Sequence, residues 1–511
     1  MKKRICSLLL ICSMLAGLLP QIVLPQAAAA DTAAAKDGFG LPTEEKTGIT
    51  NKDILRNNPY GTLGWVPLFQ NHELVVAGVD SDEFQTTYEG ATNRKDNKGS
   101  QMSTFRWSNS TAVGNAERIA TVAFDPNGTG KDEYIANLVF DKSSERLRLY
   151  VTNKDRRVSN VVQIGDGNDT EYIKKLKFYQ TRAMLSLAAG DFDGDGKDTL
   201  MIYTPGNNEK TDTVDSIKAY TFDSKNGTLN DGGRVINLGN VITATKDGKE
   251  VSGPEVLKAM LYHDGNGDNE LRAHLSVDME VGDVDMDGID ELAMTVNVND
   301  LKEKKYDGYT DYEKSYLTVY DYNDTSSWTQ KLNEKLLNSN GGASGRARFA
   351  GVTIGYVSDA PSGSMPPEVV AVGYYDKKNN YQDCDFDTSR LLAYSYRYST
   401  KDKSWEKKFE ATEVVTNGFT NTGTKGDDVQ NPIAVAAVAA DGLNSKEYLF
   451  ISGSMYQVGK VDGNQRLSIL DGSDKGHDRW LGGRLINNSG ILDYAVGNFD
   501  GNKQGMEQVY Y

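Results

Sequence analysis

Apolar and polar residues alternate in five short stretches of the chain. These stretches are "RLRLYVTN" (146–153), "SIKAYTFD" (216–223), "YLTVYDYN" (316–323), "LLAYSYRY" (391–398) and "RLSILDGS" (466–473). Alternation with a period of two is typical of half-exposed β-strands, because successive side chains of a strand point to opposite faces of the sheet. The pattern therefore predicts an all-β protein. The clearest helical spacing of apolar residues is in "GPEVLKAMLYH" (253–263), which we expect to form a helix.

A second kind of segment lies between these stretches and recurs along the chain. Each copy has a strand rich in small residues, a polar turn with an acidic residue near its end, and a second apolar strand. The copies cover 120–140, 187–203, 279–296, 352–375, 436–453 and 494–511. Trp328, Trp405 and Trp480 follow the last three alternating stretches about 75 residues apart, which indicates one sheet of four short strands per repeat. Such a sheet cannot bury both faces alone, so neighbouring sheets must stack, and radial stacking into a β-propeller leaves few exposed edges.

The predicted propeller covers residues 56–511 and has six or seven four-stranded blades. With six blades, "ELVVAGVD" (73–80) and "STFRWSN" (103–109, with Trp107) complete the blade that the last copy begins. With seven, residues 60–110 form a blade of their own. A third possibility is that the native chain continues beyond Tyr511.

Residues 1–30 are expected to be a bacterial signal peptide, and residues 31–55 a flexible lead-in. "MKKR" is a basic start, an apolar run follows, and the small residues of "QAAAA" offer a cleavage site after Ala30. The protein is therefore predicted to be secreted or associated with the cell surface. Cleavage would leave Cys384 as the remaining cysteine, which we interpret as a packing residue, so stability must come from elsewhere than disulfides.

The charge of the chain narrows the class of partner. The formal net charge is −16 at pH 7 and the signal peptide is basic, so the mature chain is more acidic still. This argues against nucleic acid or an anionic membrane surface as the partner. No later segment is apolar enough to suggest membrane insertion of the mature chain, and we expect a monomer.

Two of the polar turns carry the pattern D-x-D-x-D-G, at 191–196 and 283–288. The pattern directs carboxylates at positions 1, 3 and 5 toward one centre, and the glycine at position 6 permits a sharp bend. Position 7 can add its backbone carbonyl and position 9 a further side chain. The candidate metal ligands are Asp191, Asp193, Asp195, Lys197 and Thr199 in the first loop, and Asp283, Asp285, Asp287, Ile289 and Glu291 in the second. Hard oxygen donors without His or Cys favour Ca²⁺, with an affinity on the order of 10⁻⁴ to 10⁻³ M as in extracellular modules.

Position 9 differs between the two loops. Glu291 is a good oxygen ligand, whereas at Thr199 a water or the neighbouring Asp198 would have to complete the shell. The alternative to a metal site is an ordinary Asp/Gly-rich hairpin turn, which needs no ion. A third acidic loop (Asn498, Asp500, Asn502) has fewer charges and an irregular "KQG", and metal binding there is left open. "DGNGDNE" (264–270) and "DCDFD" (383–387) lack the glycine and are interpreted as polar loops.

An apolar residue stands at position 2 of these loops (Phe192, Val284, Phe499), and a strand follows where an EF-hand would begin its helix. This strand–loop–strand arrangement resembles the FG-GAP or VCBS-type repeats of integrin α-subunit propellers and of many bacterial exported proteins. The resemblance covers most of residues 60–511 as a repeat frame. It implies a β-propeller with calcium bound by positions 1, 3, 5, 7 and 9 of some loops.

The usual catalytic patterns are missing from the sequence. The histidines are scattered, His263 and His274 included, and no nucleophile elbow or P-loop is present. The favoured function is therefore an extracellular binding or adhesion module for a protein or carbohydrate ligand. The alternative is a calcium-dependent carbohydrate-active enzyme, because some polysaccharide lyases are propellers with similar acidic loops.

Overall fold

The computed structural model describes residues 62–510 with gaps, and side chains within part of these ranges. The described ranges are 62–66, 73–80, 83–90, 102–106, 116–130, 134–141, 146–153, 158–164, 186–204, 215–265, 268–271, 273–300, 309, 315–323, 327–336, 346–376, 390–414, 433–439, 444–453, 456–457, 460–461, 464–470, 472, 480–487, 495–497 and 508–510. The predicted signal peptide and lead-in, Cys384, Trp107 and "DCDFD" lie outside them.

The described strands form six four-stranded antiparallel sheets; five are made of strands that follow one another along the chain, and in the last the hairpin β27–β28 comes between the second and third strands. The first three sheets are β1 (Thr62–Val66), β2 (Glu73–Asp80), β3 (Glu83–Gly90) and β4 (Met102–Arg106); β5 (Ala116–Phe124), β6 (Tyr134–Asp141), β7 (Arg146–Asn153) and β8 (Val158–Ile164); and β9 (Leu187–Gly190), β10 (Thr199–Thr204), β11 (Ser216–Asp223) and β12 (Thr228–Asn237). The next three are β17 (Ala273–Gly282), β18 (Glu291–Asp300), β19 (Ser315–Asn323) and β20 (Ser327–Lys335); β21 (Arg346–Gly355), β22 (Glu368–Asp376), β23 (Arg390–Ser399) and β24 (Ser404–Val414); and β25 (Ile433–Val438), β26 (Tyr448–Gly453), β29 (Asn464–Leu470) and β30 (Trp480–Asn487).

The remaining elements are short. β31 (Ala495–Gly497) pairs with β32 (Gln508–Tyr510) near the end of the chain. Three hairpins are β13 (Thr243–Lys246) with β14 (Lys249–Ser252), β15 (Tyr262–Gly265) with β16 (Asp268–Leu271), and β27 (Tyr456–Gln457) with β28 (Lys460–Val461). The predicted helix is confirmed as α6 (Pro254–Leu261), preceded by the 3-10 turn η2 (Leu238–Asn240). Within the described residues, no helix has both the length and the apolar character needed to cross a lipid bilayer.

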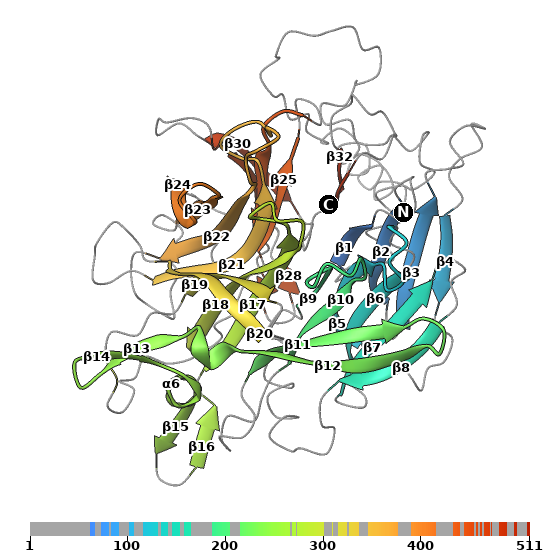
Figure 1. Ribbon diagram of the computed structural model, residues 1–511, viewed down its shortest axis with the longest axis horizontal. Coiled ribbons are helices and arrows are strands. Elements are labelled where there is room, and N and C mark those ends of the chain that lie inside the picture. The colour runs from blue at the N-terminus through green and yellow to red at the C-terminus, as the bar shows by residue number, and fades with distance from the viewer. Residues whose placement is uncertain are drawn as a thin grey trace, which may run out of the picture.

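The sheets stand side by side around a ring, so the predicted β-propeller fold is confirmed. The first strand of each sheet contacts the first strand of the next, in the order β1, β5, β9, β17, β21 and β25, and β31 contacts both β25 and β1. Figure 1 shows the orange β25 and the blue β1 on either side of the C-terminal β32. The helix α6 and the hairpins β13–β14 and β15–β16 project from the ring, between β12 and β17 in the sequence.

Strand pairing decides between two of the sequence predictions at the N-terminal end. The prediction that residues 73–80 and 103–109 complete the last blade is wrong, because β2 pairs with β1 and β3, and β3 pairs with β4. The N-terminal segment instead forms a sheet of its own, as the alternative for residues 60–110 had it. The number of blades stays a prediction, since β31 and β32 are the described strands of the last sheet.

The alternating stretches are strands as predicted, and each is the third strand of its sheet. The stretches 146–153 and 216–223 match β7 and β11 residue for residue. Trp328, Trp405 and Trp480 all lie in the fourth strands β20, β24 and β30. The acidic hairpin at 264–270 falls across the β15–β16 turn and is outside the propeller sheets.

The hydrophobic core lies between neighbouring sheets rather than within one. One apolar cluster joins β9–β12 to β17–β20 and includes the buried face of α6, and another joins β17–β20 to β21–β24. Central strands are therefore buried on both faces, as in β10, where every residue is buried. Burial of apolar area at roughly 25 cal/mol per Å² makes these contacts the main source of stability.

A pair of hydrogen bonds, here called a clasp, joins three pairs of neighbouring sheets. Each clasp joins one sheet to the sheet before it. An acidic residue directly before the second strand of the later sheet makes both hydrogen bonds, and its partner is the backbone of the residue directly after the first strand of the earlier sheet. The Asp125 N–H donates to Asp198 Oδ2 at 2.7 Å, and the Asp198 N–H donates to the Asp125 carbonyl at 2.9 Å. The corresponding distances are 2.9 and 3.0 Å for Asp191 with Asp290.

The third clasp joins β21–β24 to the sheet that begins with β25, and among the described residues no clasp joins β17–β20 to β21–β24. Tyr356 N–H donates to Glu447 Oε2 at 2.9 Å, and Glu447 N–H donates to the Tyr356 carbonyl at 2.8 Å. Between β17–β20 and β21–β24 the residue before the second strand is Pro367, which has no N–H to donate. There, Asp278 of β17 bonds the Val352 N–H of β21 at 2.8 Å instead.

The clasp also explains a glycine at the end of the first strand. A Cβ added at Gly355 would overlap the Glu447 carboxylate and Ala437. Gly282 is the equivalent residue of β17, and in the described part of the chain no clasp joins its sheet to β21–β24. A Cβ added there would meet Ile354 at an ordinary 3.4 Å. At Gly355 a side chain would therefore collide with the clasp, whereas the Asp125–Asp198 clasp forms beside Phe124, so the need for glycine is local to this position.

We expect Gly355→Ala to destabilise the fold by about 1–3 kcal/mol, as overpacking typically does, and the matched Gly282→Ala to cost less. Urea unfolding of the two variants measures the difference. Equal stability losses at both positions would contradict the explanation.

Candidate metal centre

Two loops with the same backbone shape lie in adjacent sheets, and each joins the first strand of its own sheet to the second. The first loop (191–198) joins β9 to β10, and the second loop (283–290) joins β17 to β18. Position 6 has a left-handed backbone in both, with φ of +80° at Gly196 and +92° at Gly288. Position 4 is left-handed as well, at Gly194 (+70°) and Met286 (+65°), although Met286 is not a glycine. The second loop thus keeps a conformation that glycine favours.

The loop geometry brings the carboxylates together as the spacing predicts. Carboxylate oxygens of Asp191, Asp193 and Asp195 all lie within 4.8 Å of one another, and so do those of Asp283, Asp285 and Asp287. The position-6 N–H donates to the position-1 carboxylate at 2.9 Å in the first loop and 3.0 Å in the second. Each loop is therefore a compact group of oxygen atoms of one charge sign, exposed on one side to solvent.

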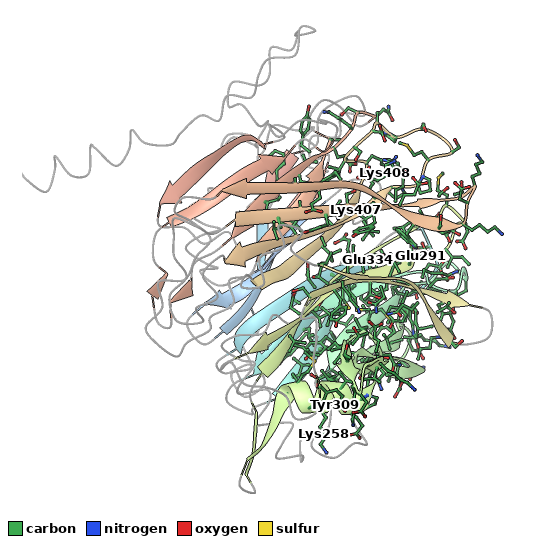
Figure 2. The ribbon with its side chains drawn as sticks, turned by 90° about the vertical axis from the view of Figure 1, so that its left-hand side faces the viewer. Lys258, Glu291, Tyr309, Glu334, Lys407 and Lys408 are labelled. Carbon is green, nitrogen blue, oxygen red and sulfur yellow. The ribbon has the colours of Figure 1, made fainter. Side chains whose placement is uncertain are left out.

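Glu291, at position 9 of the second loop, is the most informative residue of the site. Its side chain is 1% exposed, and its Oε2 accepts the Val284 N–H at 2.8 Å. The other oxygen, Oε1, is buried and has no hydrogen-bond partner among the described residues. Burial raises the pKa of Glu291 to about 9, with the charges of Asp285 and Asp287 contributing to the rise and the hydrogen bond from Val284 opposing it. Figure 2 shows Glu291 within the body of the molecule, far from Lys258 of α6.

No cationic side chain within the described residues pairs with Glu291. Across the sheet its neighbour on β19 is the buried Asp321, whose Oδ2 binds the Lys331 ammonium at 2.8 Å. The negative charge of Asp321 adds to the rise in the pKa of Glu291. Burial and the neighbouring Asp287 also raise the pKa of Asp285. An orphaned buried oxygen beside three carboxylates fits a hard divalent cation held by the second loop.

In the neighbouring sheet β21–β24, a buried glutamate at the equivalent position is paired with an arginine. Glu368 begins β22 as Glu291 begins β18, and it is fully buried. Arg397, opposite it on β23, binds the Glu368 carboxylate and also Asp359 Oδ2 at 2.9 Å. Ser358 donates to Glu368 through its N–H and its hydroxyl, each at 3.0 Å. The loop before β22 lacks the acidic pattern. The Arg397 guanidinium supplies there the positive charge that Glu291 lacks.

The first loop is partly neutralised by side chains. Lys197 Nζ lies 2.9 Å from Asp195 Oδ2, and Arg234 of β12 lies 2.6 Å from Asp193 Oδ2. The hydrogen bond from Lys197 lowers the pKa of Asp195. Asp191 Oδ1 is shielded from solvent without a hydrogen-bond partner. The donor set fits a cation less completely than that of the second loop.

Position 9 of the first loop differs from the prediction in one detail. Thr199 is buried, and Asp198 is engaged elsewhere, because its Oδ2 accepts the Asp125 N–H in the clasp. Burial raises the pKa of Asp198 to about 6. Lys197 and Ile289 stand at position 7 of their loops, and their contribution of backbone carbonyls stays a prediction. The third acidic loop (Asn498, Asp500, Asn502) lies outside the described residues.

The repeat copy at 120–140 lacks the D-x-D-x-D-G pattern, but its loop is left-handed at the same two positions as the acidic loops. Gly128 and Gly130 have φ of +70° and +71°, as positions 4 and 6 do there. Asp125 accepts the Asn127 N–H at 3.0 Å and the Thr129 hydroxyl at 3.1 Å. The glycine spacing was the signal that could have identified this shared shape. Arg397 was also missed, because nothing in "YSYRY" marks its arginine as the partner of a buried glutamate.

Comparison with known proteins finds distant structural likenesses and no family. No protein-family model and no curated protein matches the chain. Similar solved structures include the Nup133 β-propeller domain of Vanderwaltozyma polyspora (8% identity, TM-score 0.43, covering 89% of this chain and 94% of that one). Two others are Sqt1 of Saccharomyces cerevisiae (8%, 0.37, 89% and 96%) and the β-propeller domain of the Trilobed protease from Pyrococcus furiosus (11%, 0.29, 86% and 89%). These likenesses are distant, so the fold rests on the strand pairing above, and the FG-GAP or VCBS resemblance stays a prediction.

Proposed function

We propose that the chain is an exported calcium-binding β-propeller that acts as an extracellular binding or adhesion module. The observation that carries the calcium assignment is the buried, unpartnered Oε1 of Glu291 beside the carboxylates of the second loop. The export assignment is supported by the signal-like residues 1–30.

Calcium suits the second loop for chemical reasons. Its side-chain donors are carboxylates, with no sulfur or imidazole, which favours a hard cation over zinc or copper. Ca²⁺ accepts a variable number of oxygen ligands, whereas Mg²⁺ demands near-ideal octahedral geometry. The set Asp283, Asp285, Asp287 and Glu291, with the Ile289 carbonyl, would hold the ion.

The role of the ion would be structural. The loop lies between first and second strands, and its position-2 residue Val284 is fully buried in the core shared with β21–β24. Without a cation the carboxylates repel one another and Glu291 is buried without compensation. An ion that binds only the folded chain stabilises it by mass action. A rigid ring would then present a face to a protein or carbohydrate ligand outside the cell.

Replacing both Asp283 and Asp287 by Ala tests the site. In the parent, about 10 mM Ca²⁺ should stabilise the fold by about 1–3 kcal/mol for an affinity near 10⁻⁴ to 10⁻³ M, raising the melting temperature by a few degrees. The double variant should lose most of this rise, and a chelator should affect it less than the parent.

Asp223→Ala is the matched control, because Asp223 is an aspartate of the β11–β12 turn outside both loops. It should keep the full calcium-dependent rise. A calcium-dependent rise that is the same in the double variant and the parent would overturn the proposed site.

A further inference from the structure

The first and second loops are joined directly by one of the clasps. Asp290 Oδ2 accepts the Asp191 N–H at 2.9 Å, and the Asp290 N–H donates to the Asp191 carbonyl at 3.0 Å. Asp191 is position 1 of the first loop. Asp290 is position 8 of the second loop and stands between position 7 (Ile289) and position 9 (Glu291). Asp290, which lies between two candidate ligands of the second loop, thus bonds both the N–H and the carbonyl of Asp191, a candidate ligand of the first loop.

Side chains reinforce the connection between the two loops. A Cβ placed on Gly190 would lie 2.8 Å from Asp290 Oδ2, so the strand end and the clasp pack tightly. The side chain of Ile289 lies against Gly194, where an added Cβ would be 3.5 Å from Ile289 Cγ1. Phe192, at position 2 of the first loop, is fully buried and packs edge-on against Trp328 of β20, with ring centroids 5.2 Å apart.

A third connection runs through Arg234 of β12. Its guanidinium binds Asp193 of the first loop and lies 3.9 Å from the ring centroid of Tyr322, on β19. The first loop is therefore held at several points by the sheet that carries the second loop. Its conformation cannot be set independently of that sheet.

From this geometry we infer that the two loops bind Ca²⁺ with positive cooperativity, and that Asp290 is the positioning residue that couples them. The inference rests on the proposed function and extends it to the first loop, where Asp191 Oδ1 is likewise shielded from solvent without a hydrogen-bond partner among the described residues. The physical basis is shared ordering. An ion on the second loop fixes residues 289 and 291, hence Asp290 and the backbone of Asp191, so the second ion meets a loop that is already ordered. Coupling of this kind must be reciprocal between the two sites.

A thermodynamic cycle measures the coupling. Ca²⁺ alone is titrated by calorimetry into the full chain, into Asp283→Ala/Asp287→Ala, which lacks the second site, and into Asp193→Ala/Asp195→Ala, which lacks the first. We expect each remaining site to bind about 5-fold or more weakly than the same site in the parent, the lower end of typical coupling factors. The two factors should be equal within error.

The same cycle in an Asp290→Ala background tests the assigned residue. Removing the acceptor should clearly lower the coupling factor while both loops still bind Ca²⁺; the backbone bond from the Asp290 N–H and the contacts of Ile289, Phe192 and Arg234 would carry what remains. Asp290→Asn keeps an oxygen that can accept the Asp191 N–H, and should retain most of the coupling. Glu447→Ala is the matched control, because it breaks a clasp whose two residues, Glu447 and Tyr356, belong to neither loop.

The possible outcomes separate this inference from the proposed function. If the parent binds no calcium, the proposed function is overturned. If both loops bind, and removing either site leaves the affinity of the other unchanged, cooperativity alone is overturned. If coupling is undiminished in Asp290→Ala, or falls equally in Glu447→Ala, the assignment to Asp290 is overturned. The cycle in the parent needs no clasp variant, so the inference stays testable if Asp290→Ala does not fold.

Discussion

Arg397→Met should lower the free energy of unfolding by about 3–5 kcal/mol, the cost typical of removing one partner from a buried ion pair. Arg397 is 8% exposed and Glu368 is fully buried, so the substitution leaves a carboxylate with no access to water and no cation. Urea unfolding at constant slope measures the loss.

Two companion variants show whether the lost charge pairing is the cause. Arg397→Met/Glu368→Gln removes the stranded charge and should recover a large part of the stability. Lys407→Met breaks an exposed pair with Glu410, 2.6 Å long, and should cost less than about 1 kcal/mol. A loss in Arg397→Met no larger than in Lys407→Met would contradict the view that the guanidinium is the internal cation of this sheet.

Glu291→Gln should change stability in opposite directions with and without calcium. In a chelator the variant should be more stable than the parent, because it removes a buried carboxyl without a counter-charge. With millimolar Ca²⁺ it should be less stable, because a ligand of the second loop has lost its charge. Melting curves of both proteins in the two conditions measure the crossover.

The pH dependence of the ion-free protein follows from the same group. The pKa of Glu291 is raised from 4.5 to about 9 by burial, so the unfolded chain loses this proton first as pH rises. The ion-free parent therefore loses stability between about pH 4.5 and about pH 9, and the advantage of Glu291→Gln should grow across that range. Glu250→Gln, at an exposed site, should show neither the crossover nor the pH trend. If Glu291→Gln is less stable than the parent both in chelator and in Ca²⁺, the assignment of Glu291 as a calcium ligand is contradicted.

The strands could be predicted because their signal is local. In "RLRLYVTN" and "SIKAYTFD" the alternation of apolar and polar residues is set within one strand, and both match β7 and β11. The position of α6 was readable for the same reason, since its buried residues follow helical spacing. The wrong assignment of 73–80 and 103–109 was a pairing choice, which depends on contacts between strands that sequence spacing does not encode.

The candidate site was predictable in part. Spacing alone indicated that Asp283, Asp285 and Asp287 converge and that Glu291 stands at position 9. The burial of Glu291 and its lone Oε1 depend on how β18, β19 and the loop pack, so no local pattern could reveal them. The same holds for Arg397, which meets Glu368 across two paired strands.

The clasps show the limit most clearly. The acidic residue before each second strand was visible in the repeats. Its partner was not, because the bonded residues are 73, 99 and 91 positions apart for Asp198, Asp290 and Glu447. Sequence reasoning considered Asp198 as a metal ligand, whereas its carboxylate joins two sheets.

The most direct test of the account is the calcium content of the pure protein. The parent and Asp283→Ala/Asp287→Ala would each be brought to equilibrium by dialysis against about 5 mM Ca²⁺, above the dissociation constants typical of extracellular modules, and the calcium in the protein compartment would be compared by elemental analysis with that in the dialysate, which serves as the reference. We expect calcium in the parent in excess of the reference, and one ion fewer per chain in the variant. A parent that holds no more calcium than the variant when the ion is supplied in excess would contradict the central claim.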